Sequence, residues 1–232
     1  MTARDVGVVI VAGGIGTRAA EEGAELKQFR WAAGKPMLLH SVQTFMARAD
    51  VVSVVCVLPQ QYAGDPPPWL FQCDVDRLSM SIGGRTRTES VANGLDDLPD
   101  EAEIVLVHDA ARPLVGAATI ERVIASVRAG TSTIAALPVV DTLKEVDDDG
   151  LIVRTVGRDR LWRAQTPQGF PRRVIVDVHK RGRKERVTAT DDAALCERYG
   201  VPVRVVRGSE RAMKVTEADD FARIGALLTM DE

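Results

Sequence analysis

Short apolar runs alternate along the chain with longer segments that have helical periodicity. The runs Val8–Val11, Val51–Leu58 and Ile104–Val107 are continuously apolar and rich in β-branched residues, which is typical of parallel strands buried on both faces. Leu78–Ile82 is a weaker run of the same kind, and Thr133–Val140 predicts a further strand. We expect these runs to lie in one sheet, because a buried strand needs neighbours on both sides.

Helical segments lie between these runs, so the chain alternates strand and helix over most of its length. This alternation predicts an α/β, Rossmann-like fold: a mostly parallel sheet with helices on both faces, in a single domain over residues 1–232. The basic run Lys180–Arg186 is interpreted as a solvated surface loop. The predicted helices are Pro36–Ala47, Arg87–Leu95, Thr119–Ala129, Arg172–Arg181, Asp191–Tyr199 and Glu217–Leu228, with a last strand at Val203–Val206.

One segment interrupts the alternation of strands and helices. Thr142–Val146 and Leu151–Val156 are joined by Asp147-Asp148-Asp149-Gly150, whose Asp-Gly pair is a strong turn signal. The pattern predicts an inserted β-hairpin arm at about residues 141–158. A two-stranded arm is marginally stable alone, so we expect this one to pack on something, such as a second subunit.

Composition and charge restrict the class of protein. A formal net charge of -3 argues against a general nucleic-acid binder, which would show a basic balance or stripe. No apolar run approaches the roughly 20 residues that span a bilayer, and the first residues lack the pattern of a signal peptide. Cys56, Cys73 and Cys196 are too far apart for a metal motif and are expected to be reduced thiols, with Cys56 buried. We therefore expect a cytoplasmic protein without nucleic-acid or membrane partners.

A Gly-rich segment, Ala12-Gly13-Gly14-Ile15-Gly16-Thr17-Arg18, directly follows the first predicted strand, where open α/β sheets place their ligands. Part of it satisfies a loose dinucleotide pattern, but the second strand ends Val57-Leu58-Pro59-Gln60, without the acid that holds a ribose. Glycines let backbone N–H groups approach phosphate oxygens, and the following Arg18 and Lys27 suit a nucleoside triphosphate. The alternative is a plain strand-to-helix turn with a surface arginine and lysine.

A second motif, Val107-His108-Asp109-Ala110-Ala111-Arg112-Pro113, follows another core strand and should face the same crevice. Mg²⁺ usually takes only one or two protein carboxylates, so Asp109 with triphosphate oxygens is a candidate metal site. Arg112 could pair with a further phosphate. His108 is interpreted as an orienting or structural residue, because the sequence offers no cluster of metal ligands around it. Asp109 as a helix N-cap is the weaker alternative, since Arg112-Pro113 interrupts a helix at once.

A third motif runs from Gly83-Gly84 to Ser90-Val91. Its glycine pair after a strand and its hydroxyl-rich helix start could read a nucleobase with backbone groups and Ser90. By spacing alone, a capped helix with Thr88 or Glu89 in its first turn explains the motif at least as well.

With these motifs located, the chain resembles the 2-C-methyl-D-erythritol 4-phosphate cytidylyltransferases of the non-mevalonate isoprenoid pathway. The likeness covers nearly the whole chain in order, and the ordered set is far more specific than any one motif. It includes Ala12-Gly13-Gly14, Gly16, Arg18, Lys27-Gln28, Gly34-Lys35-Pro36, Gly83-Gly84, Arg87, Ser90-Val91, His108-Asp109-Ala110-Ala111-Arg112-Pro113, Asp141-Thr142, Arg158, Leu161-Trp162, Ala164-Gln165-Thr166-Pro167-Gln168, Phe170, Thr190-Asp191-Asp192 and Lys214-Val215-Thr216.

The resemblance implies CTP as the nucleotide, a polyol phosphate as the second substrate, Mg²⁺ at Asp109, and a homodimer whose subunits exchange hairpin arms. Thr142 and Arg158 would then serve the neighbouring subunit's site. The implied catalytic residues are Arg18, Lys27, Arg158 and Lys214; those for nucleotide binding are Ala12, Gly13, Gly14, Gly16, Gly83 and Ser90; and those for substrate binding are Asp109, Arg112, Thr142, Arg158, Thr166 and Lys214.

The chain departs from the family pattern at two places. Leu26 stands where the family usually has proline, and the stretch from Arg18 to Lys27 is longer than usual, so we expect the loop over the triphosphate to be set differently in this chain. Arg85 stands where an acidic residue is common, which changes the expected contact with the pyrimidine.

Three other functions fit parts of the pattern. A ribitol-5-phosphate cytidylyltransferase would share the nucleotide site and differ in the arm and in pocket shape. A sugar-1-phosphate nucleotidyltransferase would share the Gly-rich opening, but the His108–Pro113 and Thr166–Gln168 motifs speak against it. A nucleotide-sensing module without turnover is disfavoured, because both triphosphate cations and the Asp109 carboxylate are retained.

Overall fold

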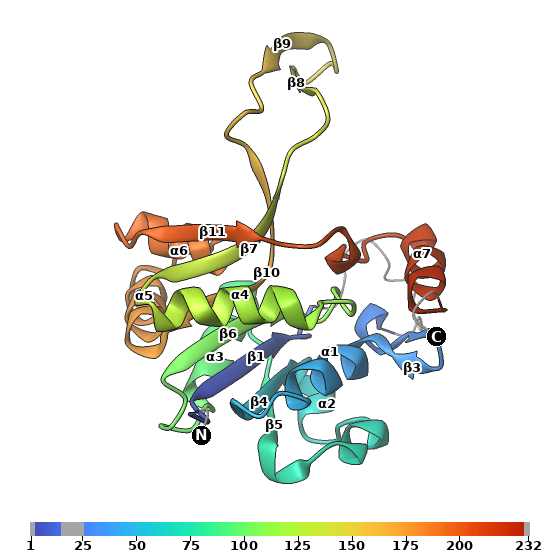
Figure 1. Cartoon of the computed structure of the whole chain (residues 1–232), viewed down its shortest axis with the longest axis vertical. Coiled ribbons are helices and arrows are strands. Elements are labelled where there is room, and N and C mark those ends of the chain that lie inside the picture. The colour runs from blue at the N-terminus through green and yellow to red at the C-terminus, as the bar shows by residue number, and fades with distance from the viewer. Residues whose placement is uncertain (1–2, 15–25, 230–232) are drawn as a thin grey trace.

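A seven-stranded sheet forms the centre of the molecule, seen in the computed structural model, which describes residues 3–14 and 26–229. Its strands are β1 (Val6–Val11), β4 (Val51–Leu58), β5 (Leu78–Ile82), β6 (Ile104–Asp109), β7 (Ser132–Pro138), β10 (Trp162–Pro171) and β11 (Val203–Arg207). They are ordered β11-β7-β10-β6-β1-β4-β5, and only β10 runs antiparallel to its neighbours (Figure 1). The predicted mostly parallel sheet is confirmed.

Helices cover both faces of this sheet, as the alternating pattern predicts. The cores place α1 (Met37–Met46) and α4 (Ala117–Arg128) on one face, and α3 (Arg87–Asp96), α5 (Arg172–Glu185) and α6 (Asp192–Arg198) on the other. The last helix, α7 (Ala218–Thr229), packs beside the short strands β2 (Trp31–Ala32) and β3 (Lys35–Pro36), and α2 (Gln60–Ala63) follows β4. No helix in the described part of the chain is long and apolar enough to cross a bilayer.

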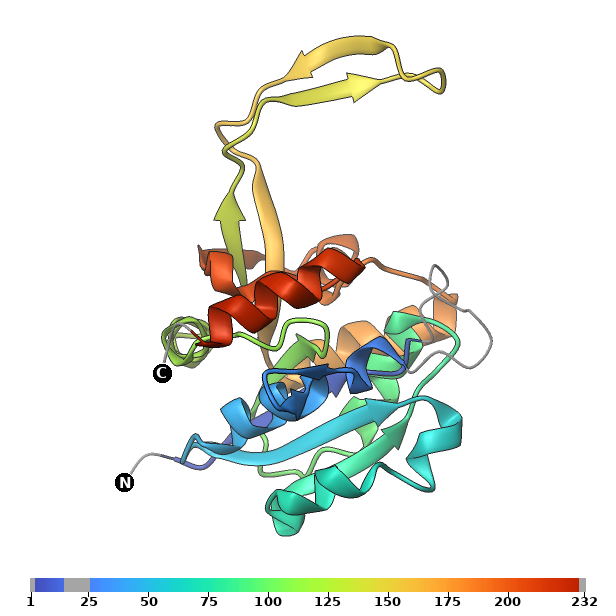
Figure 2. The same ribbon diagram turned by 90° about the vertical axis from the view of Figure 1, so that its right-hand side faces the viewer.

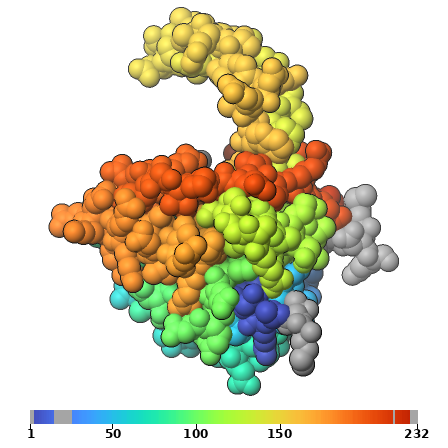
Figure 3. Space-filling view, turned by 60° about the vertical axis from the view of Figure 1, so that its left-hand side comes forward, coloured from blue at the N-terminus to red at the C-terminus, as the bar shows by residue number. Residues whose placement is uncertain are grey.

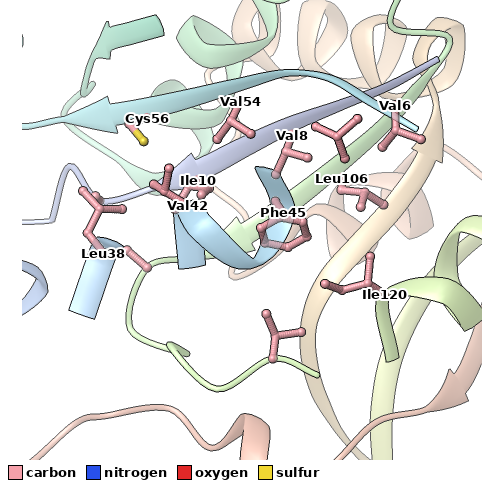
Figure 4. Packing of buried hydrophobic residues seen from close by; sticks show 14 of the residues in the cluster. Val6, Val8, Ile10, Leu38, Val42, Phe45, Val54, Cys56, Leu106 and Ile120 are labelled. Atoms are coloured by element: carbon pink, nitrogen blue, oxygen red, sulfur yellow. The ribbon is translucent and has the colours of Figure 1, made fainter. Parts of the chain in front are cut away.

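The burial of β1 explains why its sequence is an unbroken apolar run. Val8 and Ile10 pack with Phe45 of α1 in the core shown in Figure 4. Val9, on the opposite face, packs with Val91 of α3 and Phe170 of β10. Because both faces of the strand are covered, alternate polar residues would be desolvated without hydrogen bonds.

A hairpin arm stands out from the body, made of β8 (Leu143–Val146) and β9 (Ile152–Val156). Figures 1 and 2 show it at the end of two extended segments, and it rises clear of the body in the space-filling view of Figure 3. Its turn contains Gly150, which has φ of 82°. Val146, Ile152 and Val153 are more than half exposed on it. The arm therefore presents apolar surface that the body of the same chain does not cover.

Two features of the fold differ from the sequence-based expectations. The antiparallel strand β10 was not predicted, because Gln165, Thr166 and Gln168 are polar although the structure buries all three. The interpretation of Lys180–Arg186 as a loop was wrong, because α5 continues to Glu185. Its charged residues face solvent on a helix whose other face is buried, so a basic run was compatible with helix.

Candidate active site

The two glycine motifs meet at the carboxyl ends of β1 and β5. A Cβ atom built on Gly13 would lie 3.2 Å from the Cα atom of Gly83. One built on Gly83 would lie 3.1 Å from both the Gly13 Cα atom and the Leu58 carbonyl oxygen. A side chain at Gly13 or Gly83 would therefore press on backbone atoms, because the two turns meet backbone to backbone. We call this surface, made of residues 12–14 and 83–84, the glycine floor.

Gln28 fixes the geometry of the Gly-rich turn. Its side chain is buried, and its Nε2 donates to the carbonyl oxygens of Ala12 at 2.6 Å and Gly14 at 3.2 Å. The preceding Lys27 lies in the same short helix, and its Nζ donates to the Thr216 carbonyl oxygen. The helix thus ties the turn after β1 to the segment that follows Lys214.

Ser90 shapes the other half of the glycine floor from inside the protein. Its Oγ accepts a hydrogen bond from the Gly84 N–H at 3.0 Å and donates to the Thr86 carbonyl oxygen at 2.9 Å. Thr86 is the N-cap of α3, since its Oγ1 accepts from the Glu89 N–H at 3.1 Å. The capped-helix interpretation of this motif is confirmed, and base contact by Ser90 stays a prediction.

Asp109, at the end of β6, lies among three cationic side chains. Its Oδ2 is 2.9 Å from the Lys214 Nζ and its Oδ1 is 3.3 Å from the Arg87 Nε. Burial raises the pKa of Asp109, but Arg87, Lys214 and Arg112 outweigh it and hold that pKa well below its usual range. The site therefore combines an ionised carboxylate with an excess of positive charge, which suits a polyanionic ligand.

Arg87 connects Asp109 to a second buried carboxylate. Its Nη1 is 2.8 Å from the Asp192 Oδ2, and the other oxygen of Asp192 is 2.9 Å from the His179 Nε2. Burial lowers the pKa of Arg87, but Asp192 and Asp109 more than compensate and raise it overall. This row of ionic contacts was missed among the site residues. Arg87 and Asp192 belonged to the quoted motifs, but nothing in their spacing indicated that they touch.

His108 and Thr166 hold the backbone beside Asp109. The Thr166 Oγ1 accepts from the Asp109 N–H at 3.1 Å and lies 2.9 Å from the His108 Nδ1. The His108 Nε2 is 3.1 Å from the Arg112 carbonyl oxygen, which can only accept, so Nε2 carries the proton. Burial lowers the pKa of His108 to about 4. The structural role predicted for His108 is confirmed.

The burial of neutral His108 makes stability depend on pH. Its pKa in the folded state, about 4, lies below the ordinary value of 6.5, so the unfolded chain binds the extra proton first. This contribution to stability is present above pH 6.5 and is lost as pH falls towards the folded-state pKa. We expect the free energy of unfolding to fall by about 2 kcal/mol from this residue between pH 7 and pH 5.

Urea unfolding at the two pH values measures this loss, with a His108→Gln variant for comparison. Glutamine cannot take up the proton, so the pH-dependent loss should be smaller in the variant by about that amount. Equal losses in the two proteins would contradict the assignment to His108.

The structure places the remaining predicted residues in two groups. Arg112 lies beside Asp109, and its Nη1 donates to the Ala212 carbonyl oxygen at 2.8 Å. Thr142 and Arg158 are exposed and lie next to the two strands of the arm, β8 and β9, in the sequence. Figure 1 shows these strands far from β6, the strand that ends at Asp109. Arg158 donates to the Val140 carbonyl oxygen. Gly16 and Arg18 lie outside the described residues.

The side chains available as metal ligands limit which metal ion could bind at the candidate site. Within residues 3–14 and 26–229, no group of three or more His, Cys, Asp or Glu side chains could bind an ion. Asp109 offers one hard carboxylate, and both of its oxygens contact cations. This fits a hard divalent ion that brings most of its oxygen ligands with a bound phosphate, and it does not fit a protein-enclosed metal site.

The sequence profile of the family described as IspD, 2-C-methyl-D-erythritol 4-phosphate cytidylyltransferase, matches residues 6–230. The chain belongs to this family of nucleotidyltransferases. A relative from Syntrophus aciditrophicus, a 2-C-methyl-D-erythritol 4-phosphate cytidylyltransferase, is 37% identical to this chain over 227 residues. The match covers 97% of this chain and 96% of that protein. The bifunctional enzyme IspD/IspF of Gluconobacter oxydans is 38% identical over 96% of this chain. This chain spans only 56% of that bifunctional protein.

A solved structure of the same family shares the fold. The 2-C-methyl-D-erythritol 4-phosphate cytidylyltransferase of Thermus thermophilus superposes with a TM-score of 0.81 at 31% identity, over 97% of this chain and 99% of that one. The superposition extends over almost all of both chains. The fold that carries the glycine floor and the Asp109 cluster in this chain is thus shared with that structure.

Proposed function

We propose that this chain joins CTP and 2-C-methyl-D-erythritol 4-phosphate, giving the CDP-methylerythritol product and pyrophosphate for isoprenoid precursor biosynthesis. Family membership supports the substrate pair. The observation that carries the proposal is the Asp109 cluster, where an ionised carboxylate lies among Arg87, Arg112 and Lys214. Such a cluster suits two phosphorylated substrates that must be brought together against their own repulsion.

In the proposed reaction, a phosphate oxygen of the polyol phosphate attacks the α-phosphorus of CTP. The new P–O bond forms as the bond between the α-phosphorus and the bridging oxygen breaks, and pyrophosphate leaves with that electron pair. A phosphate monoester is already anionic at neutral pH, so no general base is needed. Positioning and charge neutralisation therefore supply most of the catalysis.

The glycine floor, with Ala12, Gly13, Gly14, Gly83 and Ser90, is the proposed site for cytosine and ribose. The glycines of the floor carry no Cβ atom, so their backbone groups can approach a ligand closely. Beyond the floor, Gly16, Arg18, Lys27 and Lys214 would hold the triphosphate. Asp109, Arg112, Thr166 and Lys214 would receive the polyol phosphate, together with Thr142 and Arg158.

Ligand binding requires the two lysines of the described site to exchange partners. Lys214 is paired with Asp109, and Lys27 donates to the carbonyl oxygen of Thr216. Phosphate oxygens are stronger acceptors for an ammonium group than a carbonyl oxygen, so a bound triphosphate would attract both side chains. The catalytic roles proposed for Lys27 and Lys214 thus begin with the loss of these contacts.

A divalent metal ion, Mg²⁺, is the proposed cofactor, with Asp109 as its protein ligand. It would supply charge neutralisation and orientation of the triphosphate when bound. Asp109 is well suited to this role, because its low pKa keeps the carboxylate ionised.

The arm is proposed to make a homodimer in which each subunit's arm reaches its partner's site. Support comes from its exposed apolar residues and from the exposed Thr142 and Arg158 at its base. On this proposal the chain is one catalytic domain, with the arm at about residues 141–158 used for dimerisation.

Mixing two inactive variants tests the exchange of arms. Arg158→Gln impairs the arm and Lys27→Ala impairs the body, so a mixed dimer contains one site with an intact body and an intact arm. We expect a refolded mixture to regain activity that neither variant has alone, measured as pyrophosphate release. A mixture of Lys27→Ala and Asp109→Asn, both in the body, is the control and should stay inactive. Equal activity in the two mixtures would contradict the exchange.

A pyrophosphate-release assay that pairs each nucleotide with each polyol phosphate tests the function itself. Turnover with CTP and 2-C-methyl-D-erythritol 4-phosphate is expected. Preference for ribitol 5-phosphate would instead favour the alternative cytidylyltransferase. Release with a sugar 1-phosphate, or no release with any pair despite nucleotide binding, would sink the proposal.

A cytoplasmic location is also proposed, on the basis of the cysteines. Cys56, Cys73 and Cys196 are all free thiols, and burial raises the pKa of each. Unpaired thiols are typical of a reducing compartment.

A further inference from the structure

A cavity of about 470 Å³ lies between α3 and α5, separate from the glycine floor. Thr88, Glu89 and Ala92 of α3 line it, at positions that share one face of the helix. Ser90 lies on a different face, where its Oγ would be 3.4 Å from a Cβ atom on Gly13. The volume is in the range that accommodates small-molecule ligands, so α3 separates two spaces that can each hold one.

The wall of this cavity carries an excess of positive charge. Arg85, Arg183 and Arg186 line it, and Glu89 is the one acidic residue of the lining. Glu89 is paired with Arg85 at 3.0 Å and also interacts with Arg183, so a single carboxylate faces three arginines. Arg183 contacts Asp96 at 3.2 Å, but both side chains are more than half exposed, and such a pair is weak. The charge therefore favours an anion.

His179 adds a buried polar atom without a partner. The side chain is 3% exposed and lies in the cavity wall, and its Nε2 is held by Asp192 at 2.9 Å. Its Nδ1 is buried and has no hydrogen-bond partner among the described residues. Buried polar atoms in native proteins are nearly always paired. This one has almost no accessible surface, so a ligand in the cavity would supply its partner as the ring turns towards it.

Arg186 occupies a backbone position that normally belongs to glycine. It ends α5 with φ of 56° and ψ of 38°, and the next N–H, of Val187, closes back on the Gly182 carbonyl oxygen at 2.9 Å. A non-glycine residue in this left-handed conformation is strained. Strained residues of this kind concentrate at ligand sites, and this one lines the cavity.

We propose that this cavity binds a small phosphorylated anion, with its phosphate between Arg183 and Arg186 and against the His179 Nδ1. The ionised oxygens of a phosphate group accept from guanidinium groups. Inorganic phosphate and the singly ionised form of a phosphate monoester also carry a P–OH, which can donate to a ring nitrogen. The site is distinct from the proposed active site and does not depend on the proposed reaction.

Histidine NMR signals test the site with inorganic phosphate and pyrophosphate as probes, each titrated at constant ionic strength. The chain has three histidines, so the Cε1–H signal of His179 is readily assigned. We expect this signal to shift with at least one of the two probes at concentrations below about 10 mM. A stronger response to phosphate would indicate a monophosphate ligand, and a stronger response to pyrophosphate a diphosphate ligand.

Arg186→Gly tests the site with a substitution that is expected to stabilise the fold, so that a loss of binding is not explained by misfolding. Glycine relieves the left-handed strain, so the melting temperature should rise by a few degrees while the affinity for the probe falls about tenfold. Lys184→Gln is the matched control, because it removes a positive charge from the same turn of α5 but outside the cavity, and it should bind as the wild type does.

The active site could bind the same probes, so Lys214→Gln is included. The shift of the His179 signal should persist in this variant, since Lys214 is no part of the cavity. Loss of the shift in Lys214→Gln, unchanged affinity in Arg186→Gly, or a His179 signal that moves with neither probe would each overturn the proposal.

Discussion

Replacing Asp109 by asparagine is expected to lower kcat by about 10²–10³-fold while the protein remains folded. Asparagine keeps the size of the side chain but removes the charge that balances Arg87 and Lys214, whose contacts with Asp109 are 3.3 Å and 2.9 Å. It also removes the only carboxylate proposed for Mg²⁺. Arg87 retains its ion pair with Asp192 at 2.8 Å, so it is not left buried without a partner.

Steady-state kinetics with both substrates measure this effect, and Mn²⁺ binding in the presence of CTP gives a readout independent of turnover. Asp100→Asn is the control, because it removes the same charge from a fully exposed side chain. Circular dichroism should show folded protein for both variants. If Asp109→Asn kept a kcat within about threefold of the wild type, the central role of this carboxylate would be wrong.

The strands that could be predicted from the sequence are those whose buried residues are apolar. Val51–Leu58 and Leu78–Ile82 were predicted with the bounds that β4 and β5 have. The strand β10 escaped because its buried polar groups are satisfied by partners far away in sequence. Gln168, for example, accepts from the N–H groups of Asp192 and Ala193 and donates to Asp191. Such compensation is a property of the tertiary structure, and a local pattern does not contain it.

In the candidate site, too, some features could be predicted from local sequence and others depend on tertiary contacts. The positions of the glycine floor and of Asp109 follow from one rule, that ligands collect at the carboxyl ends of parallel strands. The contact of Arg87 with Asp192 joins residues 105 positions apart, and it depends on how α3 packs against α5, the helix that precedes α6. Motif matching quoted both residues without placing them together. The cavity beside His179 was not foreseen at all, since its arginines come from separate segments.

Replacing Lys27 by alanine is expected to lower kcat by about 10²–10³-fold and to change the KM for CTP much less. Charge grows on the α-phosphate oxygens only as the new bond forms, so a cation aimed there acts mainly in the transition state. In the structure the Lys27 Nζ donates to the Thr216 carbonyl oxygen and lies 3.5 Å from that of Val215. Steady-state kinetics with CTP as the varied substrate measure the two parameters separately.

A purely structural role for Lys27 makes a different prediction. If its task were only to tie the short helix Lys27–Phe29 to the segment after Lys214, alanine would lower the melting temperature and loosen CTP binding together. Lys35→Ala serves as the control, since Lys35 is an exposed lysine whose Nζ contacts only the Gln43 side chain, at 2.9 Å, among the contacts described. A near-wild-type kcat in Lys27→Ala, or a loss confined to KM, would remove Lys27 from the catalytic residues and leave Arg18 and Lys214 to neutralise the triphosphate.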